Sequence, residues 1–99
     1  MYQKFIINQD GVLIFGNVYQ HRELLKCGDT CPYGGGLWSY DALRGAILLY
    51  GRSFAFGPPE IAQVRDIDWD SAGCVPCPLF FLPDWPQENR LLPVAPSLW

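Results

Sequence analysis

One short apolar run, Ala46–Tyr50 (AILLY), constrains the fold of this chain most. No polar alternation interrupts the run, so it predicts a strand that is central in its sheet and buried on both faces. The run leads into a loop bounded by Gly51 and Gly57 that carries Arg52 and Ser53. Glycines let a backbone approach a ligand closely, so such a loop can build an anion site without a large cavity.

The length and composition favour one folded domain. The chain has 99 residues, of which 49% are hydrophobic and 15% aromatic, which supplies a core and argues against disorder. The net charge of −3 does not favour binding to nucleic acid, which requires a basic surface. No apolar segment is long enough to span a bilayer, and the first residues turn polar too early for a signal peptide, so we expect a cytoplasmic protein.

The periodicity predicts an α/β (α+β) domain with a central mixed sheet and two short helices. Strands are expected at residues 2–7, 12–15, 37–40 and 46–50 and, at an edge of the sheet, 65–70. Helices are expected at residues 18–26 and at about residues 59–64.

The expected edge strand carries three carboxylates at alternate positions. Asp66, Asp68 and Asp70 alternate with Ile67 and Trp69. Alternation with a period of two is typical of a strand with one solvated face, and we favour that interpretation over a catalytic carboxylate pair.

The composition changes after residue 70. Six of the nine prolines lie in residues 71–99, and so do Phe80, Phe81, Trp85 and Trp99. Prolines exclude long regular elements, so we expect an α/β domain over residues 1–70 and an irregular extension over 71–99. The aromatic side chains need cover, so this extension either packs back onto the sheet or offers an apolar surface for self-association or a partner.

The four cysteines fall into two close pairs, Cys27 with Cys31 and Cys74 with Cys77. Such pairs can supply a four-cysteine zinc site, but the first pair is spaced more widely than in the usual zinc knuckle. In a reducing cytoplasm, free thiols are the leading interpretation, with zinc and disulfides as alternatives. No cofactor is predicted.

Four segments occur in an order that is similar to a known family. They are residues 4–7 (KFII), 19–21 (YQH), 31–37 (CPYGGGL) and 49–58 (LYGRSFAFGP). Together they resemble the Janus family, whose best-known members are the phosphohistidine phosphatases. The last segment is the most specific, since the family pattern there is Val-Tyr-Gly-Tyr-Ser-Met-Ala-Tyr-Gly-Pro. The resemblance extends over about residues 4–69 and implies the family's small α/β domain.

The resemblance implies a small hydrolase, acting without a metal, or a phosphate-binding protein. His21 would be the general base that activates water for attack on a phosphoryl group. The backbone N–H groups of His21 and Arg22 would bind phosphate oxygens. Ser53 and the backbone of Phe54 and Ala55 would bind the others. The implied partner is a phosphorylated protein or a small phosphate ligand.

Three further positions bear on the charge of that site. Lys4 would neutralise phosphate charge, and Arg52 is a further candidate for phosphate binding at a family tyrosine position. Leu37 stands where the family has the arginine that follows the triple glycine, so a bidentate phosphate clamp is missing. The alternative is a non-catalytic binding or interaction module on the same scaffold, because function resides in the site and not in the fold.

Overall fold

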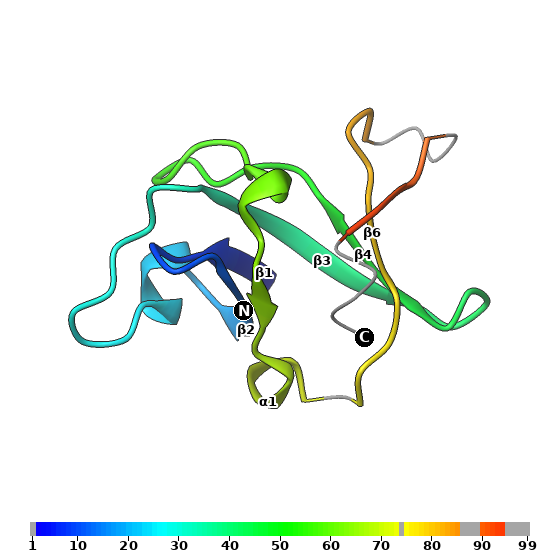
Figure 1. Cartoon of the computed structure of the whole chain (residues 1–99), viewed down its shortest axis with the longest axis horizontal. Coiled ribbons are helices and arrows are strands. Elements are labelled where there is room, and N and C mark those ends of the chain that lie inside the picture. Colours follow the sequence, from blue (N-terminus) through cyan, green and yellow to red (C-terminus); the bar gives the residue numbers. More distant parts are fainter. Residues whose placement is uncertain (1, 74, 86–89, 95–99) are drawn as a thin grey trace.

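The described residues of the computed structural model, 2–73, 75–85 and 90–94, form one mixed sheet with the strand order β5-β2-β1-β3-β4-β6-β7 (Figure 1). The strand bounds are β1 Tyr2–Ile7, β2 Val12–Val18, β3 Gly35–Asp41, β4 Ala46–Tyr50, β5 Asp66–Ile67, β6 Leu79–Phe81 and β7 Leu92–Pro93. Neighbouring strands run antiparallel, except that β5 is parallel to β2 and β6 is parallel to β4. The prediction of a central mixed sheet is confirmed.

The hairpin between β1 and β2 is closed by an asparagine. The Oδ1 atom of Asn8 accepts hydrogen bonds from the N–H groups of Asp10 (2.9 Å) and Val12 (3.0 Å). Gly11 has a φ of 74°, a left-handed conformation that favours glycine. This turn sets a register in which every residue of β1 pairs with β2.

The second half of strand β1, residues 5–7, is buried on both faces and divides the apolar residues into two clusters. Phe5 and Ile7 belong to the larger cluster, whose buried members also include Leu13, Phe15, Trp38, Ile47, Leu49, Val64, Ile67, Leu79 and Val94. Ile6 faces the other way and packs with Ile14 and Leu24. Side chains alternate along a strand, so Lys4 lies on the same face as Ile6.

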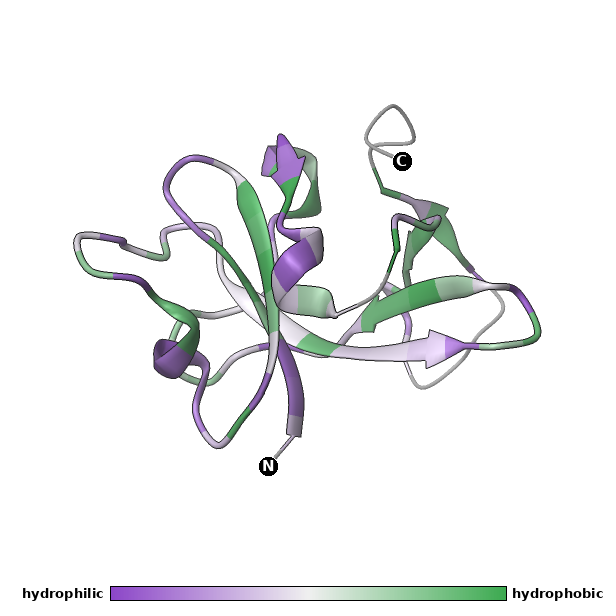
Figure 2. Ribbon diagram, turned by 90° about the horizontal axis from the view of Figure 1, so that it is seen from below, coloured by the Kyte–Doolittle hydropathy of each residue, from purple (hydrophilic) through white to green (hydrophobic). Residues whose placement is uncertain are grey.

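Strand β4 confirms the prediction of a buried strand, since Ala46, Ile47 and Leu49 are completely buried. In Figure 2 it is the hydrophobic strand of the β3–β4 hairpin, while the end of β3 is more hydrophilic. Residues after 70 cover its free edge. The extension packs back onto the sheet and is less irregular than expected, because β6 and β7 add two short strands to it.

The two short helices that the sequence predicts are present only as short 3-10 helices. In place of a helix over residues 18–26, β2 continues to Val18 and is followed by the 3-10 helix η1, His21–Leu24. The strand continues because it pairs with β1 as far as Val18, opposite Tyr2, and Gly16 within it leaves room for Leu24 of η1. A Cβ atom at Gly16 would lie 2.5 Å from Leu24 Cδ2. The second expected helix is the 3-10 helix η2, Ile61–Gln63, so the domain is mostly sheet.

The edge strand expected over residues 65–70 is β5 only in part. After Ile67 the chain turns into the short helix α1, Trp69–Ala72, because Asp68 Oδ1 accepts a hydrogen bond from Ser71 N–H (3.2 Å). Ser71 Oγ in turn accepts from the N–H of Phe15 (3.1 Å), which ties α1 to β2. None of the helices in the described part of the chain has the length and hydropathy to cross a membrane.

Candidate phosphate-binding site

Three segments that are distant in the sequence converge on one pocket of about 320 Å³. It is lined by Lys4, Tyr19, Gln20, His21, Arg22, Phe54 and Ala55. The volume lies within the range usual for small-molecule sites. Of the seven residues predicted for the site, the structure brings together His21, Lys4, Arg22, Phe54 and Ala55.

His21 is the buried polar group of this pocket, with 6% of its surface exposed. Its Nε2 atom lies 2.8 Å from the backbone oxygen of Gly36. A carbonyl only accepts, so Nε2 carries the proton and Nδ1 of the neutral ring is a free base. No described residue bonds to Nδ1. Trp38 Nε1 is the one buried side-chain nitrogen or oxygen without a partner in the described residues, so Nδ1 is reached by solvent.

The surroundings of His21 lower its pKa. Burial is the main cause, and the nearby ammonium group of Lys4 adds to it, whereas the hydrogen bond to Gly36 acts in the opposite direction. A histidine ordinarily titrates at a pKa of about 6.5. With a lowered pKa, the imidazole of His21 is neutral at pH 7 and can accept a proton.

Gly35 and Gly36 of the triple glycine allow close packing of neighbouring strands. A Cβ atom at Gly35 would lie 2.3 Å from the oxygen of Phe5 and 3.3 Å from Cδ2 of His21. A Cβ atom at Gly36 would lie 2.5 Å from the oxygen of Tyr50. Both glycines belong to β3, so they allow β1, the histidine ring and the end of β4 to approach that strand closely.

Ser53 does not line the pocket, but it stabilises the loop that carries Phe54 and Ala55. The residue is completely buried, and its Oγ accepts a hydrogen bond from the N–H of Phe56 (3.1 Å). The N–H of Ser53 donates to Gly35 (2.9 Å) and to Gly57 (3.2 Å), and Gly57 N–H returns a bond to the oxygen of Ser53 (2.9 Å). The predicted direct role of its hydroxyl on phosphate therefore becomes a role in fixing the loop.

The backbone N–H groups around the pocket are free to bind an anion. Those of His21, Arg22, Phe54 and Ala55 donate no hydrogen bond to any described residue. Lys4 Nζ donates to the backbone oxygen of Tyr19 at 2.6 Å, which holds its ammonium at the pocket. The pocket lining thus combines the cationic residues Lys4 and Arg22 with four unpaired backbone N–H donors.

Neither Arg52 nor Leu37 lines this pocket. Both line a separate groove of about 490 Å³, together with Gly51, Pro58, Pro59, Phe81, Leu82, Pro83 and Trp85. The prediction that Arg52 binds phosphate beside His21 is not supported by this geometry. Tyr19 and Gln20 of the YQH segment, by contrast, line the pocket and had no predicted role.

The contacts of Cys31 are relevant to the four-cysteine zinc site that the sequence left open as an alternative. Cys31 Sγ–H donates to the backbone oxygens of Ile7 (3.4 Å) and Gly34 (3.2 Å), and burial raises the pKa of its thiol. Cys31 is therefore a protonated donor that holds the loop before β3. Cys74 lies outside the described residues, and within them no three histidine, cysteine or acidic side chains gather as metal ligands.

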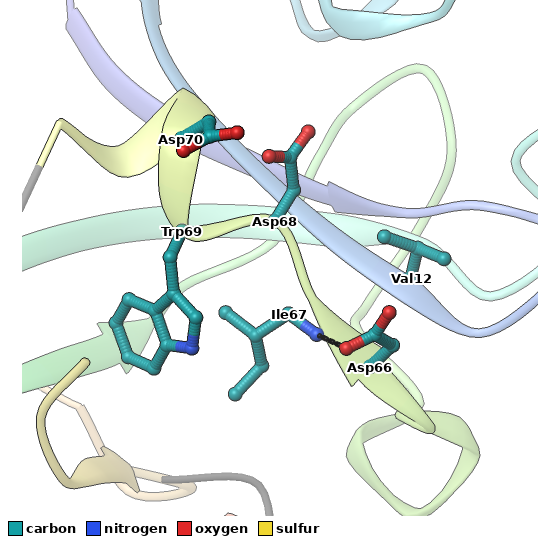
Figure 3. Close-up of a pocket in the computed structure, with 6 residues that line it drawn as sticks. All are labelled: Val12, Asp66, Ile67, Asp68, Trp69 and Asp70. Carbon is teal, nitrogen blue, oxygen red and sulfur yellow. Dashed lines mark hydrogen bonds between the residues drawn. The ribbon is translucent and has the colours of Figure 1, made fainter. Parts of the chain in front are cut away.

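A second pocket, lined by the alternating aspartates, is shown in Figure 3. Two of the three carboxylates have structural partners. Asp66 Oδ1 accepts from the N–H of Ile67 (2.8 Å), and Asp68 caps α1 and lies 3.5 Å from Lys26 Nζ. Figure 3 shows the Trp69 indole and Ile67 pointing away from the carboxylates of Asp68 and Asp70. This arrangement fits a half-solvated edge.

Comparison with known proteins gives no further assignment. No protein-family model matches the chain, and neither a curated protein nor a solved structure matches it.

Proposed function

We propose that this protein binds a phosphoryl group in the pocket around His21 and hydrolyses it, as a divergent member of the Janus or phosphohistidine phosphatase-like family. The observation that carries the proposal is the convergence of Lys4, the 19–22 segment and the Phe54–Ala55 backbone around one neutral histidine. Lys4, His21, Arg22, Phe54 and Ala55 are site positions that the resemblance implies, and they come from three distant parts of the chain.

The proposed chemistry uses the groups that line the pocket. The four unpaired N–H groups and Lys4 hold the phosphoryl oxygens and stabilise their charge. A water molecule attacks phosphorus, and His21 Nδ1 takes the proton that the water loses. The bond from phosphorus to the leaving group breaks, and its electron pair departs with the leaving group. Phosphoryl transfer depends mainly on such positioning and charge stabilisation.

Leu37 favours the alternative, a phosphate-binding module without catalysis. It pairs with Lys4 across β1 and β3, so the two side chains lie on one face of the sheet. An arginine in this position would add a planar cation beside the lysine, and leucine does not. This module would still bind phosphate through the same pocket.

The proposal also covers the partner, the self-association and the cellular compartment of the protein. The partner is a phosphorylated protein or a small phosphate ligand. The apolar extension after residue 70 is proposed as a surface for self-association. The thiols of Cys27 and Cys31 are not in disulfides, which suits a reducing compartment, and we propose the cytoplasm.

The test combines binding with hydrolysis. Calorimetry with inorganic phosphate measures binding, and release of phosphate from phosphohistidine and from phenyl phosphate measures hydrolysis. His21→Ala should lower hydrolysis by about 10²–10⁴-fold, much more than it weakens binding. Phosphate binding without hydrolysis in the wild type would favour the module. Absence of phosphate binding would rule out both forms of the proposal.

A further inference from the structure

Two exposed aromatic side chains flank the pocket. Phe54 is fully exposed (100%) and Tyr19 is 66% exposed, although both line the cavity around His21. Exposed apolar residues occur singly on most surfaces, but two aromatic rings beside one anion site are a specific arrangement. They come from different segments, so two separate parts of the pocket lining each carry an exposed aromatic residue.

Both rings are carried on well-anchored backbone. The loop of Phe54 is closed by the bridge between Ser53 and Gly57 and is attached to β3 through Gly35. Tyr19 accepts a hydrogen bond from Lys4 through its backbone oxygen. An exposed ring on an anchored segment loses little conformational freedom when it packs on a ligand, which makes it effective in recognition.

Position 54 differs from the sequence pattern that the loop resembles. The family pattern that the loop resembles has methionine there, whereas this chain has phenylalanine. A phenyl ring packs on another flat ring with a geometry that a flexible thioether does not impose. The substitution therefore points to a ligand feature beyond the phosphoryl group.

The charges of the pocket restrict the leaving group. Its lining contains Lys4, His21 and Arg22 but no aspartate or glutamate from the described residues. An alkoxide needs a general acid to leave, and His21 serves as the base on the side of the attacking water. An aryloxide leaves more easily, because a phenol has a pKa of only about 10.

We propose that the ligand carries its phosphate on an aromatic ring, as an aryl phosphate, and that Phe54 and Tyr19 select it by packing against that ring. This inference rests on the proposed function and names its substrate class. In the reaction, water forms the new bond to phosphorus and gives a proton to His21 Nδ1. The bond from phosphorus to the aryl oxygen breaks, and the aryloxide leaves with the electron pair and takes a proton from solvent.

Calorimetry with three probes tests the inference: inorganic phosphate, ethyl phosphate and phenyl phosphate. The wild type should bind phenyl phosphate about 5–10-fold more tightly than ethyl phosphate, given two ring contacts. Phe54→Ala and Tyr19→Ala should each bring this ratio closer to one, and Phe54→Tyr should retain it. Leu43→Ala is the matched control, because Leu43 is equally exposed (99%) and does not line the pocket, so the ratio should stay at the wild-type value.

Two other outcomes have separate meanings. If phosphate binds but both esters bind equally, or if Phe54→Ala weakens all three probes by the same factor, the aromatic selection is wrong and the phosphate site stands. If inorganic phosphate does not bind at all, the proposed function fails together with the inference.

Discussion

His21 and Gly36 are joined by a 2.8 Å hydrogen bond from the ring Nε2 to the backbone oxygen. The preceding carbonyl, that of Gly35, accepts the N–H of Ser53 at 2.9 Å. Two adjacent residues of β3 therefore position the candidate base and the loop opposite it. The geometry of the pocket follows from one strand, and the predictions below depend on that strand.

The titration of His21 is expected to lie below its ordinary range. Burial and Lys4 lower its pKa in the folded chain, whereas the unfolded value is about 6.5. Between the lowered pKa and pH 6.5, the unfolded state binds more protons than the folded state. The free energy of unfolding should thus fall as pH drops below about 6.5. His21 is the one histidine of the chain, so its ring signals in an NMR titration report this pKa directly. A value at or above 6.5 would contradict the prediction.

Lys4→Met should raise the pKa of His21 and weaken phosphate binding. The ammonium group lowers that pKa by charge repulsion, so its removal moves the pKa upward. Loss of one cation at an anion site should weaken phosphate binding by about 5–50-fold at low salt, with a smaller effect at high salt. Lys26→Met is the control, since Lys26 lies outside the pocket and pairs with Asp68. Equal effects of the two substitutions would exclude a local role for Lys4.

Gly35→Ala should destabilise the fold by about 3 kcal/mol or more and displace the His21 ring. The added methyl group would lie 2.3 Å from the oxygen of Phe5, and neighbouring backbone atoms do not yield easily. Gly28→Ala is a suitable comparison, because that position has a φ of 87° and no atom within 4 Å. It should cost only about 1–2 kcal/mol of backbone strain. Denaturant unfolding measures the free energy of unfolding of both variants. Similar decreases in the two variants would show that the backbone around Gly35 can shift to accommodate a methyl group.

Ser53→Ala should weaken phosphate binding although the hydroxyl does not reach the pocket. The substitution leaves the N–H of Phe56 without its acceptor, which should cost about 1–3 kcal/mol of stability and loosen the Phe54–Ala55 backbone. Ser39→Ala, in the middle of β3, should have little effect on binding. Unchanged phosphate affinity in Ser53→Ala would mean that the Gly57 bridge alone fixes the loop.

Leu37→Arg should strengthen phosphate binding. Position 37 pairs with Lys4 and lies on the same face of the sheet, so a guanidinium there can reach toward the pocket. A further charge-assisted contact should improve affinity by about 5–20-fold at low salt. Leu37→Met tests the effect of side-chain shape without charge. If affinity is unchanged in Leu37→Arg, the pocket and position 37 are independent.

The sheet was predictable where apolar periodicity was strong. The run at Ala46–Tyr50 and the hairpin around Asn8 and Gly11 were both found, because burial and turn chemistry act locally. The helix expected at residues 18–26 was not formed: Val18 pairs with Tyr2 as the last residue of β2, and only His21–Leu24 are helical, as η1. That competition is between distant segments, so no local pattern reveals it.

The sequence identified several residues that line one pocket, but not the direction in which every side chain points. Lys4, His21 and the Phe54–Ala55 backbone converge as the resemblance implies. The orientation of Ser53 depends on Gly35 and Gly57, which receive its N–H, and this contact appears only after folding. Arg52 turns to a different groove for the same reason.

Both outer strands of the sheet are only two residues long. On one side β5, Asp66–Ile67, is followed at once by α1, and on the other side β7 ends in Pro93, which has no N–H to offer. Among the described residues, each outermost strand therefore offers another chain only two residues with which to pair. Beyond β5, the rest of β2, from Ile14 to Val18, has no strand of the described part of the chain on its outer side, so strand addition, if it occurs, is expected there.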